Sequence, residues 1–181
     1  MKALVVYESM YGNTHHVAAA IAEGLAEAAD VEVVPVEGAT TERLEAAHLL
    51  VVGGPTHAHG MSRPSTRKGA ADAARKDSAL TLEPDAEGPG LRDWFDDVER
   101  ISGSAAAFDT RMHGPAAMTG CASKGIAKRL TRAGATMLAE PESFLVTKDN
   151  HLDPGEEQRA REWAIALGRA ITEAQATAGG S

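Results

Sequence analysis

The chain has 181 residues, of which 43% are hydrophobic and only 4% aromatic; this length and composition suit one α/β domain with an aliphatic core. Its 26 acidic and 18 basic side chains give a formal charge of −8, which argues against nucleic acid and anionic membranes as partners and is compatible with solubility alone or with basic protein partners. The single cysteine, Cys121, excludes an intrachain disulfide, so we expect a reducing, cytoplasmic location.

Apolar runs alternate with helical patterns along the chain. The first run, residues 3–7, indicates a buried strand and is too short for a signal-peptide core or a membrane span. Further strands are expected at residues 31–36, 48–53 and 104–109, with a final split strand at 135–138 and 143–147. Helices are expected at residues 14–28, 41–47, 91–98, 123–133 and 154–174.

The alternation of strands and helices predicts a single doubly wound domain over residues 1–176, with a parallel sheet covered on both faces. Residues 62–90 interrupt this pattern with prolines, glycines and charges, so we expect an irregular excursion with a helical turn near 70–75. Residues 177–181 are expected to form a flexible tail. Ligands bind such sheets beyond the carboxyl ends of the strands, where the loops after the first, third and fourth strands converge.

The loop after the first strand has the sequence Ser9-Met10-Tyr11-Gly12-Asn13-Thr14. It combines hydroxyl and amide donors with a glycine and the start of a helix, whose free N–H groups and dipole attract anions. The pattern favours a terminal monophosphate, with an ordinary helix cap as the alternative. A G-x-G-x-x-G motif is absent from this loop, which argues against the usual mode of nicotinamide dinucleotide binding.

The second loop follows Gly53-Gly54, and we expect the strand to end at Gly54-Pro55. Such a loop presents backbone N–H and C=O groups to a flat heterocycle, and glycine adds conformational freedom. Histidines in this loop and the next, His57, His59 and His113, are an alternative set of metal ligands, but solvated loop histidines are commoner and we expect no metal. The candidate ligand-binding residues here are Pro55, Thr56, His57, Ala58, His59 and Gly60.

The third loop follows the strand at 104–109 and is rich in small and polar residues. Arg111 is expected to pair with a ligand oxygen or with Asp109, while Cys121 is expected to serve in packing. We assign no catalytic residue. The candidate binding residues are Thr110, Arg111, Met112 and His113.

These three loops resemble those of the flavodoxin-like family. Ser9 to Thr14 matches the family's phosphate loop, Gly54-Pro55-Thr56 matches its second flavin loop, and Phe108 to Arg111 takes the place of the third. The resemblance implies a five-stranded parallel sheet in order 2-1-3-4-5 with FMN at its rim. The chain departs from the family in one respect, because its second and third loops offer no aromatic side chain beyond Phe108 to stack on the flavin.

The resemblance implies an electron-transfer protein that shuttles electrons between protein redox partners. The alternative is an FMN-dependent NAD(P)H:quinone or nitro-compound oxidoreductase with a small quinone-like acceptor, and a third hypothesis is a flavodoxin-shaped domain without flavin. The enzyme hypothesis is favoured by the lean aromatic content of the loops and by basic residues of the excursion that suit a nucleotide phosphate, although a solvated loop is the commoner role for such residues. These basic residues are Arg63, Arg67, Lys68, Arg75 and Lys76.

Overall fold

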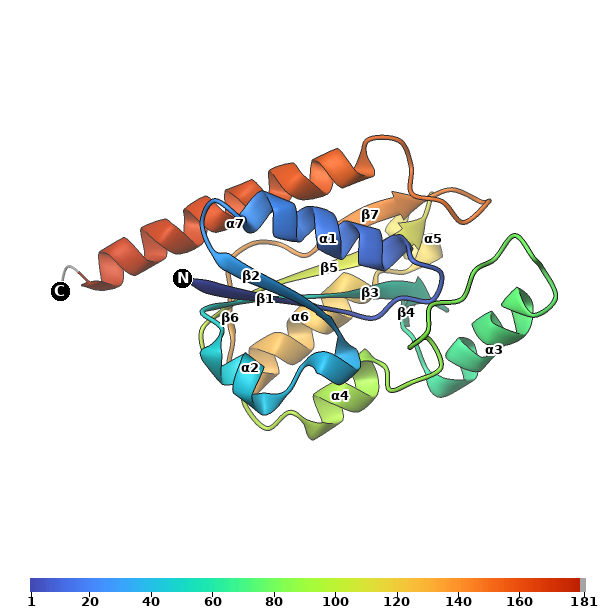
Figure 1. The fold of residues 1–181 in the computed structure, drawn as a ribbon, viewed down its shortest axis with the longest axis horizontal. Coiled ribbons are helices and arrows are strands. Elements are labelled where there is room, and N and C mark those ends of the chain that lie inside the picture. The colour runs from blue at the N-terminus through green and yellow to red at the C-terminus, as the bar shows by residue number, and fades with distance from the viewer. Residues whose placement is uncertain (180–181) are drawn as a thin grey trace.

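The computed structural model describes residues 1–179 as a parallel β-sheet between two layers of helices (Figure 1). The sheet order is β2-β1-β3-β5-β6, with β7 also beside β5 and β4 beside β3. Among the strands that the structure describes, only the β3–β4 pairing is antiparallel. The strands are β1 (Lys2–Tyr7), β2 (Asp30–Pro35), β3 (Leu49–His57), β4 (Gly60–Met61), β5 (Ser104–Met112), β6 (Thr136–Met137) and β7 (Glu142–Val146).

Helices cover both faces of the sheet. In Figure 1, α1 and α7 lie over one face, α2, α4 and α6 lie over the other, and α3 stands at the carboxyl edge. The predicted doubly wound α/β fold is therefore confirmed. The helices are α1 (Asn13–Leu25), the short 3-10 helix η1 (Val36–Gly38), α2 (Thr41–Ala46), α3 (Pro64–Ala74), α4 (Leu91–Asp97), α5 (Ala116–Thr119), α6 (Ala122–Ala133) and α7 (Glu156–Gly179).

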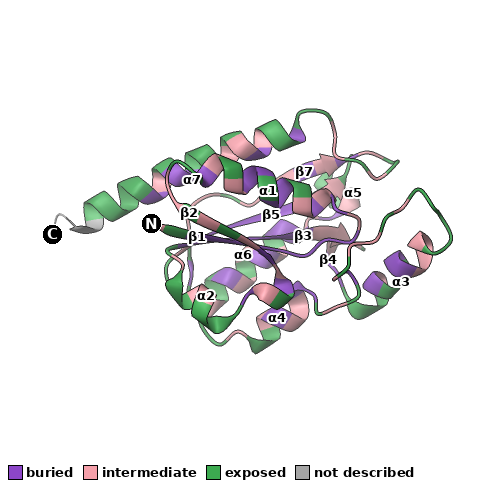
Figure 2. Cartoon of the chain, viewed as in Figure 1, coloured by how far each residue is buried: buried purple, intermediate pink, exposed green. Residues whose placement is uncertain are grey.

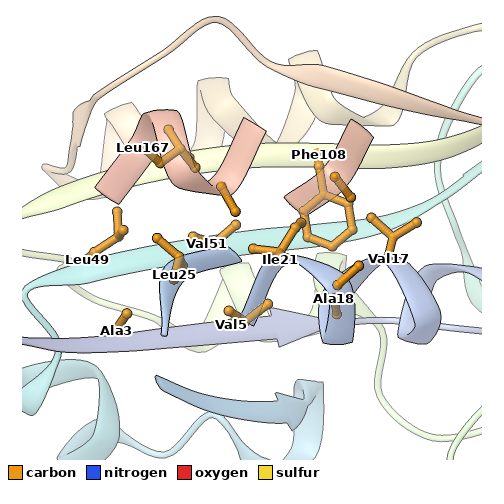
Figure 3. Close-up of a cluster of buried hydrophobic side chains, with 14 of the residues drawn as sticks. Ala3, Val5, Val17, Ala18, Ile21, Leu25, Leu49, Val51, Phe108 and Leu167 are labelled. Atoms are coloured by element: carbon orange, nitrogen blue, oxygen red, sulfur yellow. The ribbon is translucent and has the colours of Figure 1, made fainter. Parts of the chain in front are cut away.

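Alternation along the buried strands supplies a separate core for each face. Val5 of β1 packs with α1 and α7, whereas its neighbours Leu4 and Val6 pack with α4 and α6, as expected for side chains that point to opposite sides of a strand. Figure 3 shows the first of these clusters, with Ile21 of α1 and Leu167 of α7 above the sheet. Figure 2 shows that the central strands are buried while the outer helix surfaces are exposed.

The last position of the sheet is shared by two short strands. β6 pairs with the start of β5 at Ser104 and Ala105, and β7 pairs with its end, from Phe108 to Met112. The prediction of a split final strand is confirmed, and the order corresponds to 2-1-3-4-5 when β6 and β7 count as one strand.

The third strand does not end at Gly54-Pro55 as the sequence suggested. β3 continues to His57, with Gly54 and Pro55 paired to Asp109 and Thr110 of β5. The carbonyl of Gly53 accepts from Glu8 N–H on the β1 side, so the backbone of Pro55, two residues later, also faces that side. Because β1 has already ended there, the N–H that proline lacks would have no strand partner.

The segment at 62–90 is more ordered than expected, because α3 occupies Pro64–Ala74 and replaces the short turn predicted near 70–75. The segment packs on the first loop. The hydroxyl of Tyr11 donates to the Ala70 carbonyl at 2.9 Å, and the N–H of Glu83 donates to the Met10 carbonyl at 2.9 Å. At the other end of the chain, α7 includes residues 177–179, and the rest of the predicted tail lies outside the described residues.

Candidate functional site

The loops that follow β1, β3, β5 and β7 meet around a cavity of about 190 Å³ at the carboxyl edge of the sheet. Parallel strands bring their carboxyl ends to one edge, which explains how residues more than a hundred positions apart become neighbours. The cavity is lined by Ser9, Met10, Tyr11, Asn13, Thr14, Pro55, Thr56, His57, Thr110, Arg111, Met112, Val146 and Asn150.

The first loop turns tightly into α1. Gly12 has φ +90°, a left-handed conformation that glycine adopts without a steric penalty, and its N–H donates to Ser9 Oγ at 3.1 Å. The first turn of α1 has neither a side-chain cap nor an acidic residue. The N–H groups at the start of this helix therefore keep their capacity to bind an anion.

Two hydrogen bonds tie this loop to distant parts of the chain. Thr14 and Thr110, both almost fully buried, share a bond of 2.8 Å between their hydroxyl oxygens. Asn13 Nδ2 donates to the carbonyl oxygen of Asn150 at 3.0 Å and lies 3.2 Å from its Oδ1. The start of α1 is thereby held against both the β5 end and the β7–α7 loop.

The second loop is a two-residue β-hairpin between β3 and β4. Its turn residues, Ala58 and His59, both have positive φ values, +46° and +70°. Positive φ at both positions characterises a type I′ turn, which favours glycine or asparagine, so these side chains carry backbone strain. The freedom that the sequence suggested for Gly60 is not what forms the turn, because Gly60 lies in β4 and pairs with His57.

A buried carboxylate organises the second and third loops. Asp109 is fully buried, and its Oδ2 accepts from Thr56 Oγ1 at 3.0 Å and from Ser123 N–H at 2.8 Å. Thr56 Oγ1 in turn accepts from Ala122 N–H at 2.9 Å. Asp109 of β5 and Thr56 of β3 thus accept hydrogen bonds from the free backbone N–H groups at the start of α6.

Arg111 does not pair with Asp109, one of its two predicted partners. Its guanidinium instead donates to the Gly114 carbonyl at 2.8 Å and to Thr119 Oγ1 at 3.2 Å, which closes the third loop on α5. Cys121 precedes α6, with its Sγ 3.1 Å from Ser123 Oγ and 3.7 Å from Ser143 Oγ.

The three candidate histidines have different environments. His57 lines the cavity, and burial together with the charge of Arg67 lowers the pKa of its imidazole. His113 pairs with Asp153 at the β7–α7 loop, whereas His59 lies in the hairpin turn. Residues 1–179 contain no cluster of three His, Cys, Asp or Glu side chains arranged to hold a metal ion.

Eleven of the sixteen predicted binding residues line the cavity, and five do not. Sequence reasoning missed Val146 and Asn150, because the loop after the last strand carries no recognisable motif. Its one available signal was the Asp149-Asn150 pair, a combination typical of turns, and Asn150 does adopt a left-handed φ of +60°. The predicted residues outside the lining are Gly12, Ala58, His59, Gly60 and His113.

An aromatic side chain at the cavity comes from the first loop, among the residues predicted to bind the ligand. Tyr11 of the first loop lines it. Phe108 is instead fully buried below Gly53, where an added Cβ would lie 2.1 Å from its ring, and it packs edge-on against Phe144. The side chain of Phe108 therefore belongs to the core.

The fold and these loops define a doubly wound α/β protein in which the start of a helix, suited to bind an anion, lies at the carboxyl edge of the sheet. The family model for flavodoxin matches residues 5–163. This chain therefore belongs to the flavodoxin family, whose members bind FMN and transfer electrons to protein partners.

Solved structures with the same fold share little sequence with this chain. A flavodoxin from the domain Archaea has a TM-score of 0.65 at 21% identity, covering 95% of this chain and 99% of that chain. Oxidised Flavodoxin 1 and Flavodoxin 2 from Bacillus cereus both have a TM-score of 0.62, at 18% and 22% identity, covering 96% and 93% of this chain and 98% and 99% of theirs. No curated protein sequence matches the chain.

The chemistry of the residues fits FMN. Ser9 and Thr14 are each only 2% exposed and stand beside the uncapped start of α1, a donor set suited to a phosphate. One opposing charge lies nearby, because Glu83 Oε1 is 3.3 Å from the place where a Cβ on Gly12 would be. His15 Nδ1 contacts the same carboxylate at 3.3 Å.

Proposed function

We propose that this chain is an FMN-binding electron carrier that works between protein redox partners in the cytoplasm. The observation that carries the proposal is the cavity where the phosphate-type loop meets the ends of β3 and β5. The flavin would supply the redox chemistry, while the protein supplies position and electrostatics. No helix within residues 1–179 is long and apolar enough to cross a membrane.

In this proposal the phosphate is held by the first loop, from Ser9 to Thr14, through its hydroxyl groups and the N–H groups of α1. The residues of the second and third loops that line the cavity, Pro55 to His57 and Thr110 to Met112, would hold the isoalloxazine. The lowered pKa of His57 keeps this ring neutral over a wider pH range, so it adds no fixed positive charge beside the flavin.

The reductase alternative loses part of its support. Three of the five cations proposed to meet a nicotinamide phosphate form ion pairs within the protein: Arg67 with Asp93, Lys68 with Asp72, and Arg75 with Asp72 and Glu87. Their charges are therefore largely compensated. A carrier needs no nicotinamide site, so we favour the carrier.

The phosphate loop is tested by titrating the protein with FMN and with riboflavin, which lacks the phosphate. Thr14→Val should weaken FMN binding by about 1–2 kcal/mol and leave riboflavin binding unchanged. Thr110→Val is the comparison, because it breaks the same Thr14–Thr110 bond without removing a hydroxyl from the phosphate loop; as Thr110 lines the cavity itself, any loss that it causes should be equal for FMN and riboflavin. An equal loss for both ligands would remove Thr14 from the phosphate site.

The same purified protein separates the three functions. A carrier should bind FMN and keep its visible flavin absorbance when NADPH is added alone under anaerobic conditions. Bleaching by NADPH without another protein would identify the reductase. Failure to bind FMN at millimolar concentration would identify the domain without flavin.

A further inference from the structure

Helix α6 carries an uncompensated row of positive charges. It contains Lys124, Lys128, Arg129 and Arg132 and not a single acidic residue. Lys124, Lys128 and Arg132 are four positions apart, so they share one exposed face, opposite the buried Ile126 and Leu130.

This arrangement works against helix stability. Like charges at i,i+4 spacing repel each other, which applies to Lys124 with Lys128 and to Lys128 with Arg132. Lys124 also lies in the first turn, where the helix dipole disfavours a cation. The charge pattern of α6 therefore needs a reason other than helix stability.

Two other helices pair several of their cations with acidic residues of the same helix. In α3, Lys68 pairs with Asp72, and in α7, Arg159 pairs with Glu156 and Arg161 lies 3.9 Å from Glu157. None of the four α6 cations forms an ion pair within residues 1–179. Arg92 of α4 and Arg169 of α7 also form none, but among the described helices that carry Lys or Arg, α6 is the one without an acidic residue.

Two further arginines extend the positive charge beside α6. Arg92 donates to the carbonyls of Ser62 at 2.8 Å and Met61 at 3.1 Å, and a Cβ added to Gly125 of α6 would lie 3.6 Å from the end of the Met61 side chain. Burial, then the charges of Arg129 and Arg63, lower the pKa of Arg92, against the opposing charges of Asp96 and Glu8. Arg63 and Arg129 therefore each lie near Arg92.

This surface begins beside the candidate flavin site. Met61 is the last residue of the β3–β4 hairpin, whose His57 lines the cavity. From there the charges continue along α6 from Lys124 to Arg132, about 12 Å at the helical rise per residue. Charges spread over this length suit several separate acidic groups better than one phosphate.

We propose that the α6 basic surface, made by Arg63, Arg92, Lys124, Lys128, Arg129 and Arg132, docks an acidic face of a partner protein. The net charge of −8 is compatible with basic partners elsewhere on the molecule. The positive charge of the α6 basic surface, however, complements an acidic partner surface. The proposal rests on the proposed function only in identifying the partner as a redox protein, since docking itself needs no flavin.

The test measures binding of a fluorescently labelled oligo-glutamate peptide by anisotropy at low salt, with and without added FMN. Lys128→Glu should weaken binding by at least about fivefold. The matched control is Arg169→Glu on the exposed side of α7, which changes the net charge equally and should alter binding by less than about twofold. Equal losses in the two variants would overturn the proposal.

Stability provides an independent readout. Lys128→Glu creates a favourable i,i+4 pair with Arg132, so its urea midpoint should not fall while its peptide binding does. A misfolded variant cannot give this combination. Because the assay is run without FMN as well, failure of flavin binding would leave the docking result readable.

Two further outcomes would overturn the acidic-partner proposal. A wild-type dimer in sedimentation that Lys128→Glu converts to monomer would assign the surface to a second copy of this chain. NADPH binding that Lys128→Glu abolishes and Arg169→Glu preserves would assign it to a nucleotide. A monomer without such NADPH binding, together with the peptide result above, supports the proposal.

Discussion

At the scale of single residues, one carboxylate limits how well the first loop can hold an anion. Glu83 places Oε1 beside Gly12 and against His15. Burial, together with the charges of Asp85 and Glu83, raises the pKa of Tyr7 to about 12. Glu83 therefore places negative charge next to the loop that we propose to hold the FMN phosphate.

Removing this charge should strengthen FMN binding. We expect Glu83→Gln to lower the dissociation constant for FMN by about threefold at low ionic strength, with less effect at high salt. Riboflavin affinity should stay unchanged because riboflavin carries no phosphate. Fluorescence titration checks this, with the exposed Glu87→Gln as the control; weaker FMN binding in Glu83→Gln would place the phosphate elsewhere.

A second buried carboxylate, Glu8, connects the end of β1 to α4. Its Oε2 accepts from Leu91 N–H at 2.9 Å. Burial raises the pKa of Glu8 above its usual 4.5, although this hydrogen bond and the charge of Arg67 oppose the shift. The folded protein therefore binds the Glu8 proton more tightly than the unfolded chain does.

This shift has a defined effect on stability. Protonated Glu8 contributes stability that is fully present below pH 4.5 and is lost as the pH rises through the higher pKa of the folded state. The unfolding free energy of wild type minus that of Glu8→Gln should therefore decrease between pH 4 and pH 8. Urea denaturation at several pH values measures it, with the exposed Glu173→Gln as reference; a constant difference would contradict the assigned shift.

At the scale of elements, the hairpin between β3 and β4 depends on a close contact with the third loop. Gly120 has φ +83°, and an added Cβ would lie 2.1 Å from His59 Cα. His59 and Gly120 also form a β-bridge. The strained turn at Ala58 and His59 therefore rests directly on the backbone that precedes α6.

A pair of glycine substitutions isolates this contact. Gly155 also has a positive φ, +90°, but nothing lies within 4 Å of its Cβ position. Gly155→Ala should cost about 1 kcal/mol from conformation alone, whereas Gly120→Ala should cost about 2–4 kcal/mol because the hairpin must also move. Equal losses in urea denaturation would show that the hairpin does not depend on Gly120.

At the scale of the whole molecule, the site is closed by contacts between distant segments. Thr14 meets Thr110, Asn13 meets Asn150, and the 62–90 segment binds the first loop through Tyr11. A ligand held by these loops would bind only the folded chain. Its binding free energy would therefore add to the free energy of unfolding.

FMN should consequently raise the melting temperature. At one hundred times the dissociation constant the added stability is about 2.7 kcal/mol, which corresponds to roughly 5–10 °C for a domain of this size. Riboflavin at the same concentration should raise it less, because it leaves the donors of the first loop unused. Equal shifts for the two ligands would contradict a phosphate site at the start of α1.

The elements and their layering could be predicted from local sequence patterns alone. Apolar runs of strand length separated by amphipathic segments indicate a parallel sheet covered by helices. The first loop could be recognised in the sequence because a phosphate-binding loop needs particular residues next to one another. The same local logic located most of the cavity lining. It went wrong at Gly54-Pro55, where the ending of the neighbouring strand, and not the proline itself, decides whether β3 continues.

Which distant groups meet could not be predicted from local patterns, because it depends on the packing of the folded chain. Asp109 became the acceptor for the start of α6 instead of the partner of Arg111, and Asn150 joined the first loop across 137 positions. The lack of ion-pair partners for the α6 cations likewise depends on which acidic side chains the fold brings near them. A sequence shows which hydrogen-bond donors and acceptors each residue carries. The partner of each buried donor or acceptor is set by the fold, because these partners come from different strands.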